Sequence, residues 1–159
     1  MNVYQLSANN CMSHLILKDT FDNFSFIEGE ITTFNKFTIS GFLQEDFFDE
    51  KPEETYSRWN KTRDFCFQII RGKRTPLGFK IVLALPEDQV PYFLTAHGLT
   101  GYRPEEIRGL YLNFHYDGHH LQCITGTSLN TFTMDKSIER EWDQEVKNIL
   151  KSRSIEGDY

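Results

Sequence analysis

Two alternating apolar segments joined by Asp117-Gly118 constrain this chain most strongly. In residues 110–116 and 119–125 apolar and polar side chains alternate, as in strands with one buried face. An Asp-Gly pair suits a two-residue type I′ turn, because both positions accept positive φ. The sequence therefore predicts an antiparallel hairpin in which His115 faces His120 across the strands. The same alternation places four side chains on the buried face, namely Leu112, Phe114, Leu121 and Cys123.

Other periodicities predict further strands and helices around this hairpin. Strands are expected at residues 3–6, 24–33, 37–39, 65–69 and 79–85. A turn at 35–36 joins the second and third of these, and the strand at 79–85 is expected in the middle of the sheet. Helices are expected at residues 8–18, capped by the Ser7 hydroxyl, at 52–59, at 89–97 with Gly98 as its left-handed terminal residue, and at the carboxy terminus. Bulges are expected at Gly29 and in residues 125–128, where the apolar parity moves to Phe132 and Met134.

These elements indicate a single α+β domain over residues 1–159, with a mostly antiparallel sheet and a carboxy-terminal amphipathic helix that docks through Trp142. Residues 1–60 and 77–135 share the order strand, helix, strand, turn, strand. This doubled β-α-β-β order resembles the repeat of sliding DNA clamps, in which helices line one side of an antiparallel sheet. The alternative is an ordinary α+β domain whose halves look alike because this unit is common.

The charge is distributed unevenly along the chain. The 17 basic and 23 acidic side chains give −6, which argues against a surface coated with nucleic acid or anionic lipid. Residues 61–80 nevertheless carry six basic side chains against one acidic, a net of +5. This window predicts an anion site for phosphate, a nucleic-acid backbone or an acidic protein partner, formed by Arg71, Lys73 and Arg74 and supported by Lys61, Arg63 and Lys80. The alternative is a solvated hairpin tip that balances the acidic stretch at 45–54. This alternative is favoured because isolated runs of charge are usually solvated surfaces.

The sequence contains no assembled catalytic set. His115 and His120 could chelate a transition metal, but a stable site needs further ligands, and none has suitable spacing. The rival hypothesis to a binding protein is a small metal-dependent or hydrolytic enzyme that uses this pair with Thr127 or Ser128. Residues 125–128 lack the lysine of a phosphate-binding loop and the nucleophile elbow of a hydrolase, so we expect no cofactor.

The cysteines and the hydropathy indicate the compartment. Three cysteines far apart in the chain fit reduced thiols in a cytoplasmic protein better than a disulfide framework, and Cys66 and Cys123 fit core positions. No apolar run is long enough to span a membrane. We therefore expect a cytoplasmic protein without a membrane partner. The three cysteines are Cys11, Cys66 and Cys123.

Four phrases, at residues 20–24, 31–35, 72–76 and 125–129, resemble those of an uncharacterised family of small bacterial proteins known as a domain of unknown function. The resemblance covers almost the whole chain and implies no activity and no catalytic residue. The basic window in an acidic chain and the lack of an assembled catalytic set make a non-catalytic binding or interaction protein, which uses the loop from Arg71 to Arg74, the leading functional hypothesis.

Overall fold

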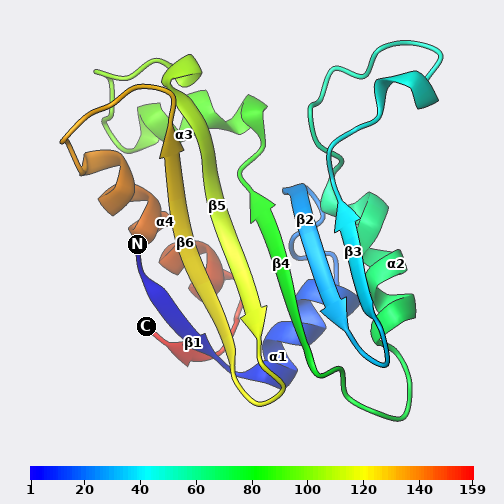
Figure 1. Ribbon diagram of the computed structural model, residues 1–159. Helices are drawn as coiled ribbons and strands as arrows, with labels where there is room; N and C mark the ends of the chain where they lie inside the picture. Colours follow the sequence, from blue (N-terminus) through cyan, green and yellow to red (C-terminus); the bar gives the residue numbers. More distant parts are fainter.

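The computed structural model describes residues 1–159 as one seven-stranded sheet with helices packed against it (Figure 1). The strands lie in the order β3-β2-β4-β5-β6-β1-β7, and all neighbours are antiparallel. They are β1 (Val3–Leu6), β2 (Ser25–Thr32), β3 (Lys36–Ser40), β4 (Gly78–Ala84), β5 (Ile107–Tyr116), β6 (Leu121–Leu129) and β7 (Gly157–Asp158). The predicted α+β class is confirmed.

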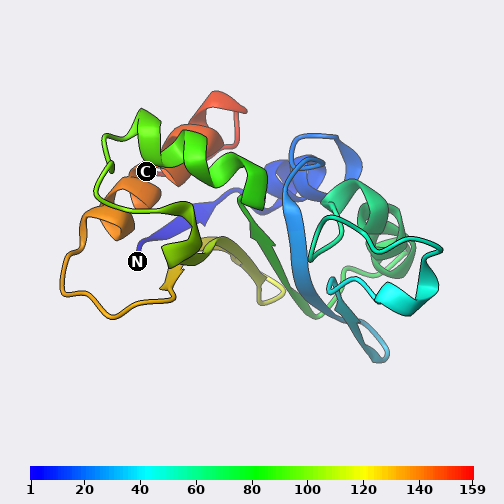
Figure 2. The same cartoon turned by 90° about the horizontal axis from the view of Figure 1, so that it is seen from above.

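The helices gather on one side of the sheet. Figure 2 shows α1, α3 and α4 together on one face of the sheet, while α2 lies beside β2 and β3. The helical segments are α1 (Ala8–Met12), the π-helical turn η1 (Ser13–Leu17), α2 (Trp59–Ile70), α3 (Val90–Ala96), α4 (Ser137–Ser152) and the 3-10 turns η2 (Glu45–Phe47), η3 (Glu87–Gln89) and η4 (Pro104–Glu106). None of these helices combines the length and the apolar character needed to cross a membrane.

Two tryptophans fix helices to the rest of the core. Trp142 of α4 is fully buried, as expected, and its indole N–H donates to the carbonyl of Tyr111 in β5 at 3.0 Å. Trp59 of α2 is also fully buried, and its indole N–H donates to the carbonyl of Leu15 at 2.8 Å. Each indole therefore buries a large apolar surface while its one polar atom stays paired.

The hairpin of β5 and β6 is confirmed, but its predicted register is wrong. Tyr116 pairs with Leu121 and His115 with Gln122, because the connection is a four-residue turn rather than two residues. The Asp117 carboxylate accepts the N–H groups of His119 and His120 at 2.9 and 2.7 Å, which holds both residues in the turn. The register moves by two residues, and a shift of two preserves which face each side chain occupies. The predicted inward-facing side chains are therefore all buried.

The prediction for residues 52–70 is wrong. Residues 52–58 form no helix, and the strand expected at 65–69 lies inside α2. The apparent alternation of Phe65, Phe67 and Ile69 misled because Phe65 is 68% exposed. The buried residues of α2 are instead Trp59, Thr62 and Cys66, at intervals of three and four residues, which is helical spacing.

Among the predictions for single strands, helices and bulges, some are confirmed and others are wrong. The β2–β3 hairpin, the central position of β4, and α3 followed by Gly98 at φ +68° are confirmed. The first helix forms over residues 8–17, but the Ser7 side chain makes no capping hydrogen bond. The bulge in β2 falls between Phe26 and Glu28 rather than at Gly29. Strand β6 runs without a bulge through residues 125–128, so Phe132 and Met134 follow it as exposed loop residues.

The doubled element order is present, as β1-α1-β2-β3 and, with the 3-10 turns η3 and η4 flanking α3, β4-α3-β5-β6. The strand neighbours of the two halves differ, because β1 pairs with β6 whereas β4 pairs with β2 and β5. The similarity to clamp repeats thus stays one of element order.

Candidate functional site

The basic loop, residues 71–77, connects α2 to β4 at the lower end of the sheet in Figure 1. Arg71, Lys73 and Arg74 are all exposed, and none forms an ion pair. Gly72 has φ +150°, a conformation that side chains rarely adopt, and a β-carbon there would meet no atom within 4 Å. The backbone of this loop is therefore open to an approaching ligand.

Exposed apolar side chains lie next to the basic loop. Its last residue, Leu77, is 68% exposed, and its N–H donates to the carbonyl of Thr32 at 2.8 Å, at the end of β2. The β2–β3 turn that follows carries Phe34, which is 86% exposed and packs edge to face on Phe37. We call Arg71, Lys73, Arg74, Leu77 and Phe34 together the basic end. It combines three free cations with two uncovered apolar groups.

The other three predicted cations lie outside the basic end. Arg63 pairs with Asp22, with 2.9 Å between the guanidinium Nε and the carboxylate Oδ1, and both side chains are largely buried. Lys61 is exposed in the first turn of α2, at the opposite end of that helix. Lys80 lies on β4 beside His115. Arg63 and Lys61 are therefore separated from the basic loop, whereas Lys80 is exposed on β4 three residues after Leu77.

The acidic segment, residues 44–54, lies at the upper end of the sheet in Figure 1, opposite the basic end. Helix α2 separates the two, and its 12 residues span about 18 Å. The segment's ion pairs are made instead by Lys51 with Glu45 and by Arg58 with Glu54. The basic loop is solvated, as the alternative interpretation expected, but it joins a helix to a strand and makes no ion pair with the acidic stretch.

The predicted histidine site is not assembled. His115 faces Gln122 on β6, whereas His120 lies in the turn beyond the strand end. Thr127 is five residues farther along β6 than Gln122, or about 17 Å. No group of three or more His, Cys, Asp or Glu side chains is placed to hold a metal ion. The enzyme hypothesis loses the pairing on which it depended.

The cysteines occupy the core, as predicted for Cys66 and Cys123. Burial raises the pKa of the Cys11 and Cys66 thiols to about 12 and raises that of Cys123 well above its ordinary value. All three are free and buried. They are therefore neutral thiols, which are poor nucleophiles.

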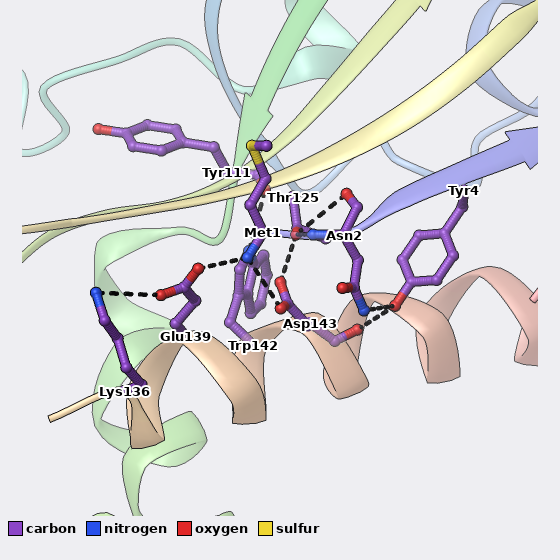
Figure 3. A network of polar contacts seen from close by, with 9 residues as sticks. All are labelled: Met1, Asn2, Tyr4, Tyr111, Thr125, Lys136, Glu139, Trp142 and Asp143. Carbon is purple, nitrogen blue, oxygen red and sulfur yellow. Dashed lines mark hydrogen bonds and ion pairs between the residues drawn. The ribbon is translucent and has the colours of Figure 1, made fainter.

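A polar network between β1, β6 and α4 has no counterpart among the sequence predictions (Figure 3). The hydroxyl of Thr125, on β6, donates to the carboxylate of Asp143, on α4, and accepts the N–H of Asn2 at 2.8 Å. The Tyr4 hydroxyl donates to the Asp143 carbonyl at 2.8 Å. A carboxylate beside Trp142, on the apolar side of an amphipathic helix, is the sequence signal that could have indicated this network.

The Met1 ammonium group joins the same network. It contacts the carboxylates of Glu139 and, at 3.2 Å, Asp143. The hydrogen bond to Glu139 raises the pKa of the amino group, and the same contact lowers the pKa of the Glu139 carboxyl. A neighbouring cavity of about 390 Å³ is lined by threonines and by these two carboxylates. Because both carboxylates are already paired, the network holds elements together rather than presenting a vacant charge.

A second polar contact outside the predictions joins α3 to α4. The two ring nitrogens of His97 lie 2.8 Å from a Glu141 oxygen and 2.9 Å from a Glu145 oxygen. The imidazole thus bridges two carboxylates and ties the end of α3 to α4. The four-residue spacing of the glutamates places both on one face of α4.

Comparison with known proteins bears on the family alone. The chain matches the model of a family of unknown function, DUF5721, over residues 14–158, from η1 to β7. A search of curated proteins found no match, and neither did a search of solved structures. The match confirms the resemblance to an uncharacterised family and assigns no activity. The chain thus belongs to DUF5721, a family of unknown function.

Proposed function

We propose that this protein is a non-catalytic binding protein that uses its basic end to recognise an acidic, aromatic-bearing segment of a protein partner. The observation that carries the proposal is the isolation of the loop's charge. Three exposed cations sit on one short loop, and no carboxylate of the chain pairs with them. The two guanidinium groups present forked donors that match carboxylate geometry.

The backbone of the basic loop is held at both ends. The Arg71 N–H donates to the Phe67 carbonyl at 2.8 Å, which ties the start of the loop to the last turn of α2. The Leu77 N–H is bonded to Thr32 at the other end, and Pro76 between them is buried. A loop fixed in this way loses less conformational freedom when it binds. The position of the cations is therefore partly organised in advance.

The apolar members of the basic end favour a protein partner over nucleic acid. Phe34 and Leu77 expose large apolar side chains next to the cations, and both suit the aromatic or aliphatic anchors of a peptide. A nucleic-acid site is typically a broad basic stripe on a basic domain. Here the chain carries −6 overall, and the loop itself carries only three cations. A short acidic segment with aromatic residues complements both features.

The proposal is tested with a fluorescein-labelled peptide of glutamate, aspartate and phenylalanine, followed by fluorescence anisotropy. The basic-loop variant, R71S/K73S/R74S, removes the three cations. At about 0.5 kcal/mol for each exposed ion pair, we expect the loss of three to weaken the Kd about tenfold. The control variant, K61S/R140S/R153S, removes three other exposed and unpaired cations, and we expect it to bind like the parent.

Two results would contradict the proposal. Equal peptide affinity of the parent and the basic-loop variant would show that these cations do not contact the partner. Binding of a labelled single-stranded oligonucleotide, without binding of the peptide, would replace the protein partner by nucleic acid. Circular dichroism of both variants checks that the fold is unchanged.

A further inference from the structure

The acidic segment is an exposed excursion from the body of the protein. Its base is closed by the bridge between Phe42 and Tyr56 and by the bond from the Leu43 N–H to the Thr55 carbonyl at 3.0 Å. Residues 44–51 between these anchors are all exposed. The segment therefore projects from the fold without being covered by it.

The composition of the acidic segment is that of a ligand for a basic, apolar surface. Residues 44–54 carry six acidic side chains against one basic, a net of −5. Phe47 is 85% exposed, and Phe48 packs edge to face against it while remaining 41% exposed. Four of the carboxylates form no ion pair: Asp46, Asp49, Glu50 and Glu53.

The basic end matches this segment in both charge and apolar character. It offers the three free cations of the basic loop, with Phe34 and Leu77 beside them. Within one molecule the two surfaces cannot meet, because they lie at opposite ends of the sheet and α2 stands between them (Figure 1). A second copy can bring its acidic segment to the basic end of the first.

We propose that copies of this protein associate head to tail, with the acidic segment of one copy bound to the basic end of the next. This inference rests on the proposed function and names the partner segment. The two contacting surfaces differ, so a pair joined by one such contact keeps one free acidic segment and one free basic end, to which further copies can add to build a ring or an open chain. Because the contact is small and strongly charged, we expect it to be weak and salt-sensitive.

The experiment measures mass by light scattering after gel filtration, over a range of protein concentrations. In about 0.01 M salt the screening length is about 30 Å, and we expect the mass to rise above the monomer's 18.7 kDa as the concentration increases. In about 1 M salt the screening length falls to about 3 Å, and we expect the monomer alone. A low-salt mass that stays at 18.7 kDa at the highest attainable concentration overturns the inference.

Two variants, each with one damaged end, make the test specific. The basic-loop variant keeps its acidic segment, whereas the acidic-segment variant, F47S/D49N/E50Q, keeps its basic end. We expect each variant alone to be monomeric, and a mixture to form one-to-one pairs and nothing larger. In such a pair the intact acidic segment of one variant is bound to the intact basic end of the other, and the two remaining ends are the damaged ones. A variant that assembles like the parent, or a mixture that stays monomeric, contradicts the head-to-tail contact.

The matched control for the acidic-segment variant is Y92S/D64N/E105Q, which removes an exposed aromatic group and two unpaired carboxylates elsewhere on the surface. We expect this control to assemble like the parent. If the protein stays monomeric while the labelled acidic peptide still binds and the basic-loop variant weakens it, the self-association fails and the proposed function stands. If the peptide does not bind either, both fail.

Discussion

Replacing Thr125 by valine tests the polar network between β6 and α4 directly. Valine has nearly the shape of threonine, so the substitution removes the hydroxyl without leaving a cavity. Thr125 is 1% exposed, and its hydroxyl donates to the Asp143 carboxylate while accepting the Asn2 N–H. Both partner groups lose a hydrogen bond in the variant.

The expected loss of stability follows from these two bonds. A hydrogen bond to a charged group contributes about 1.5–3 kcal/mol, and one between neutral groups about 1 kcal/mol. We therefore expect Thr125→Val to lower the free energy of unfolding by about 2–4 kcal/mol. At about 3 °C per kcal/mol for a domain of this size, Tm falls by about 6–12 °C.

Urea unfolding followed by circular dichroism measures the change, with Thr127→Val as the matched control. Thr127 is the next inward-facing residue of β6 and makes no side-chain hydrogen bond within the chain, so we expect a change within about 0.5 kcal/mol. A double-mutant cycle with Asp143→Ala should give a coupling energy of at least about 1 kcal/mol. Equal stability of the two valine variants, or a coupling near zero, would refute the assignment of this hydroxyl to Asp143.

Three further predictions concern the turn, the cysteines and α2. Backbone N–H bonds from the turn lower the pKa of Asp117 below its ordinary 3.8. The stabilisation that the Asp117 carboxylate gives the fold is therefore complete above pH 3.8 and is lost as the pH falls through the lowered pKa. Acid unfolding of Asp117→Ala should lack this pH-dependent loss of stability. A thiol reagent at pH 8 should label no cysteine of the folded protein and all three after denaturation, because burial keeps the thiols protonated. By thermal unfolding, Trp59→Ala should cost about 3–5 kcal/mol and Phe65→Ala less than about 0.5 kcal/mol; equal losses would contradict the helical face of α2.

Periodicity predicted the β5–β6 hairpin's inward face but not its pairing. The alternation from Leu112 to Cys123 identified the buried side chains, since parity survives any even shift. The pairing depended on the Asp117 carboxylate, which bonds two N–H groups and extends the turn to four residues. In α2, the short apolar alternation around Phe67 fitted a strand as well as a helix. Only the burial of Trp59, Thr62 and Cys66, at helical spacing, distinguished the two. Local pattern is ambiguous where tertiary contacts decide.

The candidate site divides in the same way. The sequence located the cations at 71–74 because their charge is a local property of the chain, and these residues form the basic end. It also grouped Arg63 with them, although Asp22 neutralises that guanidinium from 41 residues away. The contributions of Phe34 and Leu77 required the β2–β3 turn to lie beside the basic loop, which is a contact between distant segments.

By itself, the sequence determined the α+β class, the antiparallel hairpins, the amphipathic α4 and the position of the charged runs along the chain. These depend on neighbours within a few residues, where side-chain periodicity and turn chemistry act. Only the tertiary structure decided that Thr125 bonds Asp143, that His115 faces Gln122 rather than His120, and that the acidic segment and the basic end occupy opposite ends of the sheet. The reason is physical: charge and hydropathy belong to single residues, whereas a partner, a distance and a direction arise only when segments remote in sequence pack together.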